Sequence, residues 1–194
     1  MWRWIWRERL QAQRDMSLSL IGLSGSLRRQ SYSTAVLHSL RDSLPGDVRL
    51  DVRSLEDIPL FNDDLDGEAA PATVAALRRD VAAADGLVVI SPEYNHGMSG
   101  VLKNALDWLS RPGQASCLRD KPVLTLTASP SALGGVRAQQ QLNETFIATC
   151  SRLVIRRQIV IGMVAEKVMD GRLVHPPTLD FVLEGFRDLR DVCG

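Results

Sequence analysis

A loop rich in serine, glycine and arginine follows the first apolar run of the chain. Residues 24–31 (SGSLRRQS) stand between an apolar segment at 18–23 and a segment with helical spacing. Hydroxyl donors, a guanidinium and the backbone N–H groups at the start of a helix can all bind one anion. The loop is therefore suited to a phosphate group, although serine-rich turns without a ligand are common. It is not a dinucleotide fingerprint, because neither G-x-G-x-x-G nor G-x-x-x-x-G-K-[ST] occurs there.

A second polar loop, residues 92–97 (PEYNHG), comes after a continuous apolar run at 87–90. That run is rich in β-branched residues, which favours a strand buried on both faces of its sheet. Pro92 cannot donate to the strand ladder and so ends it, and Ser99 is a suitable N-cap for a helix at 100–109. In open α/β sheets, ligands bind at the carboxyl ends of such strands. Taken alone, however, loop 92–97 is equally typical of a turn without a ligand.

A third loop of small polar residues, 128–135 (ASPSALGG), follows another buried run at 121–127. Serines in these loops are weak candidates for a hydrolytic nucleophile, because no G-x-S-x-G elbow surrounds them. Three loops of this kind follow three predicted strands. Together they support a shared binding site more strongly than any one loop does alone.

The second loop and its helix carry a specific family resemblance. Residues 91–108 (SPEYNHGMSGVLKNALDW) closely resemble the corresponding segment of the NADPH-dependent FMN reductase family, a flavodoxin-like group that contains chromate, quinone and azo-dye reductases. The first loop resembles the family pattern G-S-x-R-x-x-S-x-N, with Ser33 in place of the asparagine. Residues 134–139 (GGVRAQ) resemble a third family motif, G-G-x-R-A-Q.

This resemblance implies an FMN-dependent oxidoreductase. NADPH or NADH would supply hydride to the flavin, and a second acceptor (a quinone, an azo dye, a metal oxyanion or free flavin) would remove it by a ping-pong mechanism. No catalytic side chain is predicted, because flavin N5 carries the chemistry. Arg28 with the loop serines would hold the phosphate, and 92–95 would line the isoalloxazine edge. The predicted cofactor-binding residues are Ser24, Ser26, Arg28, Ser31, Ser33, Pro92, Glu93, Tyr94, Asn95, His96, Gly97 and Ser129.

Two other functions stay open at this point. A non-enzymatic FMN electron carrier is disfavoured because such carriers are usually strongly acidic, whereas this chain has a formal net charge of zero. A binding module that has lost its flavin rests only on the substitution at Ser33 and on the contacts that stay unassigned. If the reaction needs a general acid to supply a proton, the candidates nearest to the predicted flavin are Glu93, Tyr94 and His96.

Alternating strand and helix patterns predict the scaffold that would position these loops. Repeated βα units imply a parallel sheet with right-handed crossovers. We predict an α/β, flavodoxin-like three-layer sandwich whose five-stranded parallel sheet has the order 2-1-3-4-5, which brings the three loops to one edge. This domain is assigned to 18–194, and 1–17 to an N-terminal extension. The expected strands are 18–23, 48–52, 87–90, 121–127 and 153–161.

Composition excludes several other classes of protein. The chain has 194 residues, of which 45% are hydrophobic and 24% charged. A neutral chain is not a nucleic-acid binder that relies on general positive charge. No apolar run approaches the roughly 20 residues needed to span a bilayer. No histidine or acidic cluster has metal-site spacing. The three cysteines lack metal or redox spacing, so reduced thiols and a cytoplasmic location are expected.

Two segments suggest contacts with other molecules. Residues 1–15 hold three tryptophans, and a flexible extension is favoured over a membrane-surface or partner-binding arm. Helix 100–109 has two apolar stripes, and a surface helix of a monomer needs only one. We therefore expect a homodimer or homotetramer, with Trp108 at the subunit contact. The alternative is that both stripes are buried inside the same domain.

Overall fold

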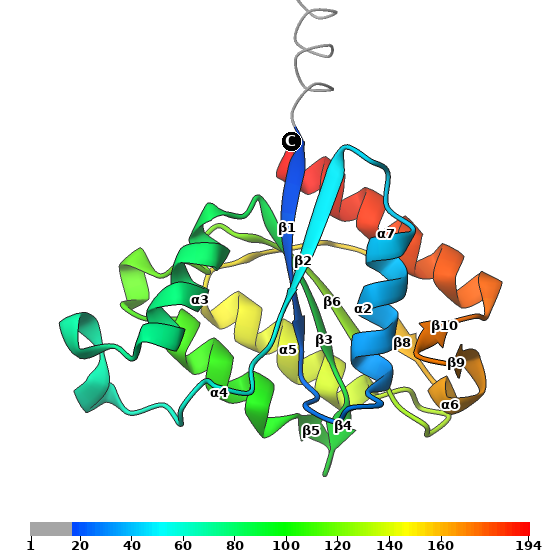
Figure 1. The fold of residues 1–194 in the computed structure, drawn as a ribbon, viewed down its shortest axis with the longest axis horizontal. Helices are drawn as coiled ribbons and strands as arrows, with labels where there is room; N and C mark the ends of the chain where they lie inside the picture. Colours follow the sequence, from blue (N-terminus) through cyan, green and yellow to red (C-terminus); the bar gives the residue numbers. More distant parts are fainter. Residues whose placement is uncertain (1–16) are drawn as a thin grey trace, which may run out of the picture.

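The computed structural model describes residues 17–194 and shows a parallel sheet with helices on both faces (Figure 1). The predictions made for residues 1–15 lie outside this part of the chain. The strand order β2-β1-β3-β6 continues with two short strands that both pair with β6, so the predicted order and fold class are confirmed. The strands are β1 (Leu18–Ser24), β2 (Val48–Arg53), β3 (Gly86–Ser91), β6 (Pro122–Ala128), β7 (Arg152–Leu153) and β8 (Ile159–Ile161).

Alternate residues of each central strand face two separate cores. Leu87 and Val89 of β3 lie in the core under one set of helices, and Val88 and Ile90 lie in the other. This is why 87–90 reads as a continuous apolar run. The first core is covered by α3 (Ala72–Ala83), α4 (Gly100–Leu109) and α5 (Val136–Ala148), and the second by α2 (Tyr32–Asp42) and α7 (Pro176–Cys193), as Figure 1 shows.

Short elements fill the connections. Two of them are antiparallel hairpins, one after β3 and one before α7. The hairpin after β3 matters for function, because it is formed by the second ligand-like loop. The short elements are β4 (Glu93–Tyr94), β5 (Gly97–Met98), β9 (Val168–Met169), β10 (Arg172–Leu173), α6 (Val164–Lys167), η1 (Asp63–Leu65), η2 (Gly67–Ala69) and η3 (Gly113–Ala115).

The predicted fifth strand at 153–161 is wrong as a single strand. The chain leaves the sheet after Val154, whose N–H still donates to the Val123 carbonyl of β6 at 3.0 Å, and it rejoins the sheet at β8. Arg156 turns onto α7, where its guanidinium lies 2.6 Å from the Asp188 carboxylate and stacks 4.8 Å from the centroid of the Phe181 ring. Gly185 leaves room for it, since a Cβ there would lie 2.9 Å from Arg156 Nη1. The long basic side chain thus gains a partner on α7 at the expense of strand pairing.

The predicted subunit contact at Trp108 is also wrong. Trp108 is fully buried within its own domain, and its Nε1 donates a hydrogen bond to the Pro59 carbonyl at 2.8 Å. The Phe61 ring packs edge-on against it at 4.9 Å between centroids. Asn104 donates to the same carbonyl and accepts from Phe61 N–H. The loop after β2 therefore covers the second apolar stripe of α4.

An ion pair between Asp66 and Arg78 ties the later part of this loop to α3. Arg78 of α3 donates hydrogen bonds to the Trp108 carbonyl and, at 2.7 Å, to the Asp66 carboxylate. The hydrogen bond from Arg78, with a weaker one from Gly67 N–H, holds the pKa of the Asp66 carboxyl below its ordinary value of 3.8. A carboxyl whose pKa is depressed by folding stabilises the fold above its unfolded pKa, and this contribution is lost as the pH falls through the folded pKa.

We expect Asp66→Asn to lower the free energy of unfolding by about 1 kcal/mol at pH 7, because the ion pair is only partly exposed. The difference from the wild type should shrink below a pH of about 4, where the wild-type carboxyl begins to lose its charge in the unfolded chain. Urea unfolding of both proteins at pH 7 and pH 3 measures it. An equal difference at both pH values would show that the charge on Asp66 is not the cause.

Two negative findings apply to residues 17–194. In this part of the chain, no helix has the length and apolar character needed to cross a membrane. The same residues contain no group of three or more histidine, cysteine or acidic side chains that is arranged to hold a metal ion.

Candidate functional site

The loops after β1, β3 and β6 leave the sheet at its carboxyl edge, the lower end in Figure 1. The first two loops touch closely. Gly25 N–H donates to the Ile90 carbonyl at 2.8 Å, and a Cβ on Gly25 would lie 2.6 Å from Ser99 Oγ and 3.2 Å from Pro92 Cδ. Glycine is therefore needed at position 25 for the two loops to meet.

Hydroxyl groups fasten the first loop to α2. Ser31 is the N-cap of α2, and its side chain accepts a hydrogen bond from Thr34 N–H at 3.1 Å. Ser24 Oγ accepts from Thr34 Oγ1 at 2.9 Å and more weakly from Ser26 N–H at 3.4 Å. These contacts shape the loop as an open turn before the helix.

The backbone of this loop and of the first turn of α2 offers several free donors. No N–H group from 27 to 33 donates a hydrogen bond to any group within the described residues. Arg28 is exposed and stacks 4.7 Å from the centroid of the Tyr32 ring, without a carboxylate partner in that same part of the chain. Free amides, a helix N-terminus and an unneutralised guanidinium are the groups that bind a phosphate.

Ser33, which stands in place of the asparagine of the family pattern, is buried in this structure. It is only 2% exposed, on the inner side of α2. The next residue, Thr34, lines a cleft of about 290 Å³ together with Ser24, Ser26 and Arg28. Thr34 was not among the predicted residues, although a second hydroxyl beside the position of the family asparagine was a usable signal.

A second cleft, of about 450 Å³, lies on the other side of the same loop. It runs between α2 and the β9–β10 hairpin. Arg29, Tyr32, His38 and Asp170 are among the residues that line it. Arg28 thus lines the first cleft and Arg29 the second, and both also line a smaller, open hollow of about 200 Å³ with Gln30.

The second loop is a tight β-hairpin. Tyr94 pairs with Gly97, and the two-residue turn Asn95-His96 has φ angles of 50° and 67°. Two successive left-handed residues make the turn type that best fits the twist of a hairpin. Tyr94, Asn95 and His96 are exposed, and the N–H groups of Asn95 and His96 donate no hydrogen bond within residues 17–194.

The Glu93 side chain reaches from the hairpin to α5, and its Oε1 lies 3.9 Å from Nδ1 of His96 at the hairpin tip. Its Oε2 accepts hydrogen bonds from the N–H groups of Arg137, at 3.0 Å, and Ala138, at 3.1 Å, in the first turn of α5. Its side chain is only 16% exposed. Glu93 therefore caps a helix that begins more than 40 positions later in the sequence. This contact was not predicted.

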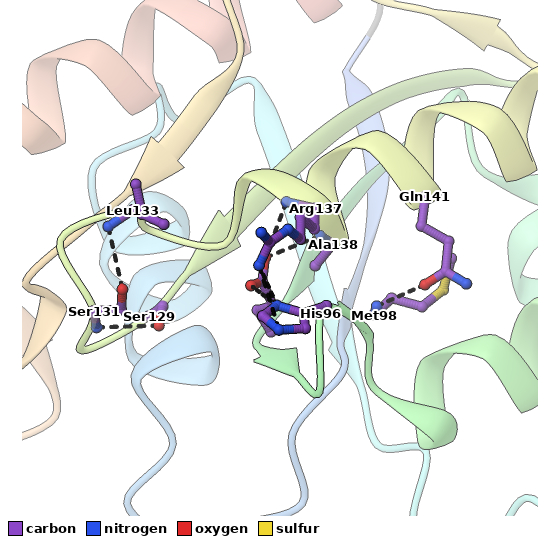
Figure 2. Close-up of polar contacts among 9 residues, drawn as sticks. His96, Met98, Ser129, Ser131, Leu133, Arg137, Ala138 and Gln141 are labelled. Carbon is purple, nitrogen blue, oxygen red and sulfur yellow. Dashed lines mark hydrogen bonds and ion pairs between the residues drawn. The ribbon is translucent and has the colours of Figure 1, made fainter.

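The other strand of the hairpin is held by the same helix (Figure 2). Met98 N–H donates to Gln141 Oε1 at 2.7 Å, and the absence of a Cβ on Gly97 leaves room for that side chain. The Arg137 guanidinium meets the His96 ring at the turn. Arg137 belongs to a motif singled out in the sequence, whereas no sequence signal pointed to Gln141.

The third loop is closed by its own serines (Figure 2). Ser129 Oγ accepts from Ser131 N–H at 3.2 Å, and Ser131 Oγ accepts from Leu133 N–H at 3.3 Å. Ser129 N–H donates to the Ile161 carbonyl, which ties the loop to β8. Gly134 has a φ of 64° and lies against Gly162, where a side chain would strike the backbone. Most of the Ser129 side chain is buried.

Comparison with known proteins gives the family of this chain. The sequence profile of the NADPH-dependent FMN reductase family matches residues 18–166. The chain belongs to this family. The resemblance noted from the sequence is thereby confirmed, and so are the expectations of an NAD(P)H-dependent FMN reductase or quinone reductase type of enzyme and of FMN and NAD(P)H as its cofactors.

Named relatives cover most of this FMN reductase chain. A quinone reductase of Escherichia coli is 37% identical over 168 residues, which is 84% of this chain and 88% of the relative. An NAD(P)H-dependent FMN reductase of Pseudomonas aeruginosa is 33% identical over 175 residues, or 89% and 94%. The solved flavoenzyme NAD(P)H:acceptor oxidoreductase FerB of Paracoccus denitrificans has a TM-score of 0.79 at 27% identity, covering 91% of this chain and 97% of its own.

The residues at the carboxyl edge of the sheet offer the kinds of group that can bind FMN. The free amides at 27–33 and the Arg28 guanidinium supply donors and positive charge for a phosphate. The free amides of Asn95 and His96 are donors of the kind that polar ring atoms accept. The Glu93 carboxylate is already bound by two N–H groups in the first turn of α5, and Ser33 is only 2% exposed.

Proposed function

We propose that this protein transfers hydride from NADPH or NADH to bound FMN and then to a small-molecule acceptor, in two separate half-reactions. A quinone is the first acceptor that we propose, since relatives up to 37% identical over most of the chain are named quinone reductases. Quinone, NAD(P)H and one proton give hydroquinone and NAD(P)⁺, so the reaction is balanced without a further reagent. Azo dyes, metal oxyanions and free flavin are further candidate acceptors.

One observation of the chain itself carries the proposal. The free backbone donors at 27–33 and the unneutralised Arg28 stand at the same sheet edge as the exposed hairpin tip Asn95-His96. Such an edge can bind an anionic tail at one end and leave a planar ring accessible at the other. When bound, FMN supplies the hydride-accepting atom, and the protein contributes position and electrostatics.

The residues have separate tasks in this proposal. Arg28, Ser26 and the amides of the first loop bind the phosphate, with Thr34 holding Ser24 in place. The hairpin amides face the ring, where they would stabilise negative charge. Pro92, Gly97 and Ser129 shape the loops that carry these groups. Tyr94, on the exposed side of the hairpin, is placed to contact the nicotinamide or the acceptor.

The proposal predicts a two-step colour change. NADPH or NADH added without oxygen should bleach the yellow protein, and a benzoquinone should restore the colour with one quinone consumed per NAD(P)H. Initial rates at several fixed quinone concentrations should give parallel double-reciprocal lines, because the two substrates never share the site. Intersecting lines would contradict the substituted mechanism. Reduction by a protein donor, but by neither nicotinamide, would favour the electron-carrier alternative.

Assembly and location belong to the same proposal. A homodimer or homotetramer is still what we propose, but its support no longer includes Trp108 and rests on exposed apolar side chains elsewhere, such as Ile147 and Ile155. Sedimentation under native conditions measures it. The three free cysteines suit the reducing cytoplasm, which is the location that we propose.

A further inference from the structure

We propose that Glu93 is a positioning residue that locks the β4–β5 hairpin onto the N-terminus of α5, so that the loops after β3 and β6 form one preformed wall of the cofactor site. This inference rests on the proposed function for the identity of the ligand. The lock itself is a property of the protein without any ligand. It assigns Glu93 neither to flavin contact nor to acid catalysis.

The hairpin is tied to α5 at two points, one helical turn apart. Glu93 in β4 accepts from the N–H groups of Arg137 and Ala138, and Met98 in β5 donates to Gln141 (Figure 2). Positions 137 and 141 lie on the same side of a helix. Because each strand of the hairpin has its own tie, the hairpin can neither lift from α5 nor rotate against it without breaking a hydrogen bond.

The start of α5 needs a cap from outside the helix. Its N-cap is Gly135, which has a φ of 99° and offers no side chain. A larger residue would not fit there, since a Cβ would lie 3.1 Å from that of Thr127 and 3.4 Å from that of Glu93. The free N–H groups of the first turn and the positive end of the helix dipole both favour a carboxylate. Glu93 supplies it from the neighbouring loop.

The same contact links two loops of the candidate site. Glu93 lies between Pro92 and the hairpin tip, and α5 begins directly after the third loop. Ordering the hairpin before the ligand arrives removes an entropy cost from binding. The Arg137 side chain, whose own N–H is bound by Glu93, reaches the His96 ring at the turn and adds a third tie.

The first test is made on the protein without FMN. Glu93→Ala should raise the hydrogen-exchange rates of the Arg137, Ala138 and Met98 amides by about tenfold or more relative to the wild type, because their acceptors or their local packing are lost. Glu144→Ala, an exposed glutamate on the same helix, is the matched control and should leave these three rates unchanged. Unchanged rates in Glu93→Ala would overturn the lock, whatever the protein binds.

The second test uses FMN. Glu93→Ala should weaken FMN binding by about 3- to 30-fold, the range that corresponds to the usual effect of losing a helix cap. Glu93→Gln keeps one acceptor oxygen, so its FMN affinity should be close to that of the wild type. Flavin reduction by NADPH at saturating FMN should change by less than about threefold in Glu93→Gln. A loss of about 100-fold or more in that rate with unchanged FMN affinity would identify Glu93 as a general acid instead.

Gln141→Leu keeps the test informative if Glu93→Ala fails to fold. It cuts the other tie and leaves the α5 cap intact, so it should also weaken FMN binding. Combined with Glu93→Gln, it should show a non-additive effect, because both residues hold the same hairpin. Strictly additive effects on FMN affinity would contradict a shared lock. A wild-type protein that binds no FMN, but shows the predicted exchange effect, would overturn the proposed function alone.

Discussion

Trp108→Ala is expected to lower the free energy of unfolding by about 3–5 kcal/mol, the largest effect that we predict for any single substitution in this protein. The indole is fully buried between α4 and the loop after β2. Its removal leaves a cavity beside Phe61 and deprives the Pro59 carbonyl of its Nε1 donor, while Asn104 still bonds that carbonyl. Urea unfolding followed by far-UV circular dichroism measures the change.

Leu60→Ala is the matched control for this prediction. Leu60 stands in the same loop, between the two residues that contact Trp108, but its side chain is 84% exposed. Its truncation should change the free energy of unfolding by less than about 0.5 kcal/mol. A contradicting result would be a Trp108→Ala variant that is as stable as Leu60→Ala but has a different sedimenting mass. The indole would then belong to a subunit contact and would not be buried within its own domain.

Trp108 also shows which contacts could not be predicted from the sequence. The two apolar stripes of α4 were visible in the sequence, and their burial was predictable. What covers the second stripe was not, because Trp108 and Asn104 bond the Pro59 carbonyl across 49 and 45 positions of sequence. Loop 54–70 has no periodic pattern that would reveal a buried side of its own. A stripe without a visible partner then resembles a subunit contact.

Local features of the fold were predicted far better. The buried run at 87–90 is a strand with both faces in the core, and Ser99 is the N-cap of α4, since each depends only on residues a few positions away. The prediction of one continuous fifth strand was wrong because it considered only residues close in sequence to 154–158. The partner of Arg156 is Asp188, 32 positions later.

The candidate site divides in the same way. Its three loops follow from strand ends and family motifs, and the parallel topology brings them to one edge. The inward turn of Glu93 onto α5 depends on a helix that begins 43 positions later, so the side chain looked like a polar group of the flavin loop. The position of Thr34 in the cleft beside Arg28 was not predicted, because one residue of helical phase separates it from the buried Ser33.

Arg28→Ala is expected to weaken FMN binding by about 1.5–3 kcal/mol, which corresponds to roughly 10- to 150-fold in the dissociation constant. Arg28 is exposed, lacks a carboxylate partner within residues 17–194, and stands beside the free amides of 27–33. A charge-assisted bond to the phosphate would be lost, while the amides stay in place. Fluorescence quenching of added FMN measures the affinity, and its salt dependence should become weaker in the variant.

Two controls separate the phosphate contact from a general loss of structure. Riboflavin has the same ring without the phosphate, so its affinity should be the same in Arg28→Ala and in the wild type. Arg29→Ala removes an equal charge from the neighbouring cleft beside the β9–β10 hairpin and should change FMN affinity by less than about threefold. The opposite ranking of the two arginines would place the phosphate in that second cleft, and an equal loss of riboflavin binding would show that Arg28 supports the loop rather than the anion.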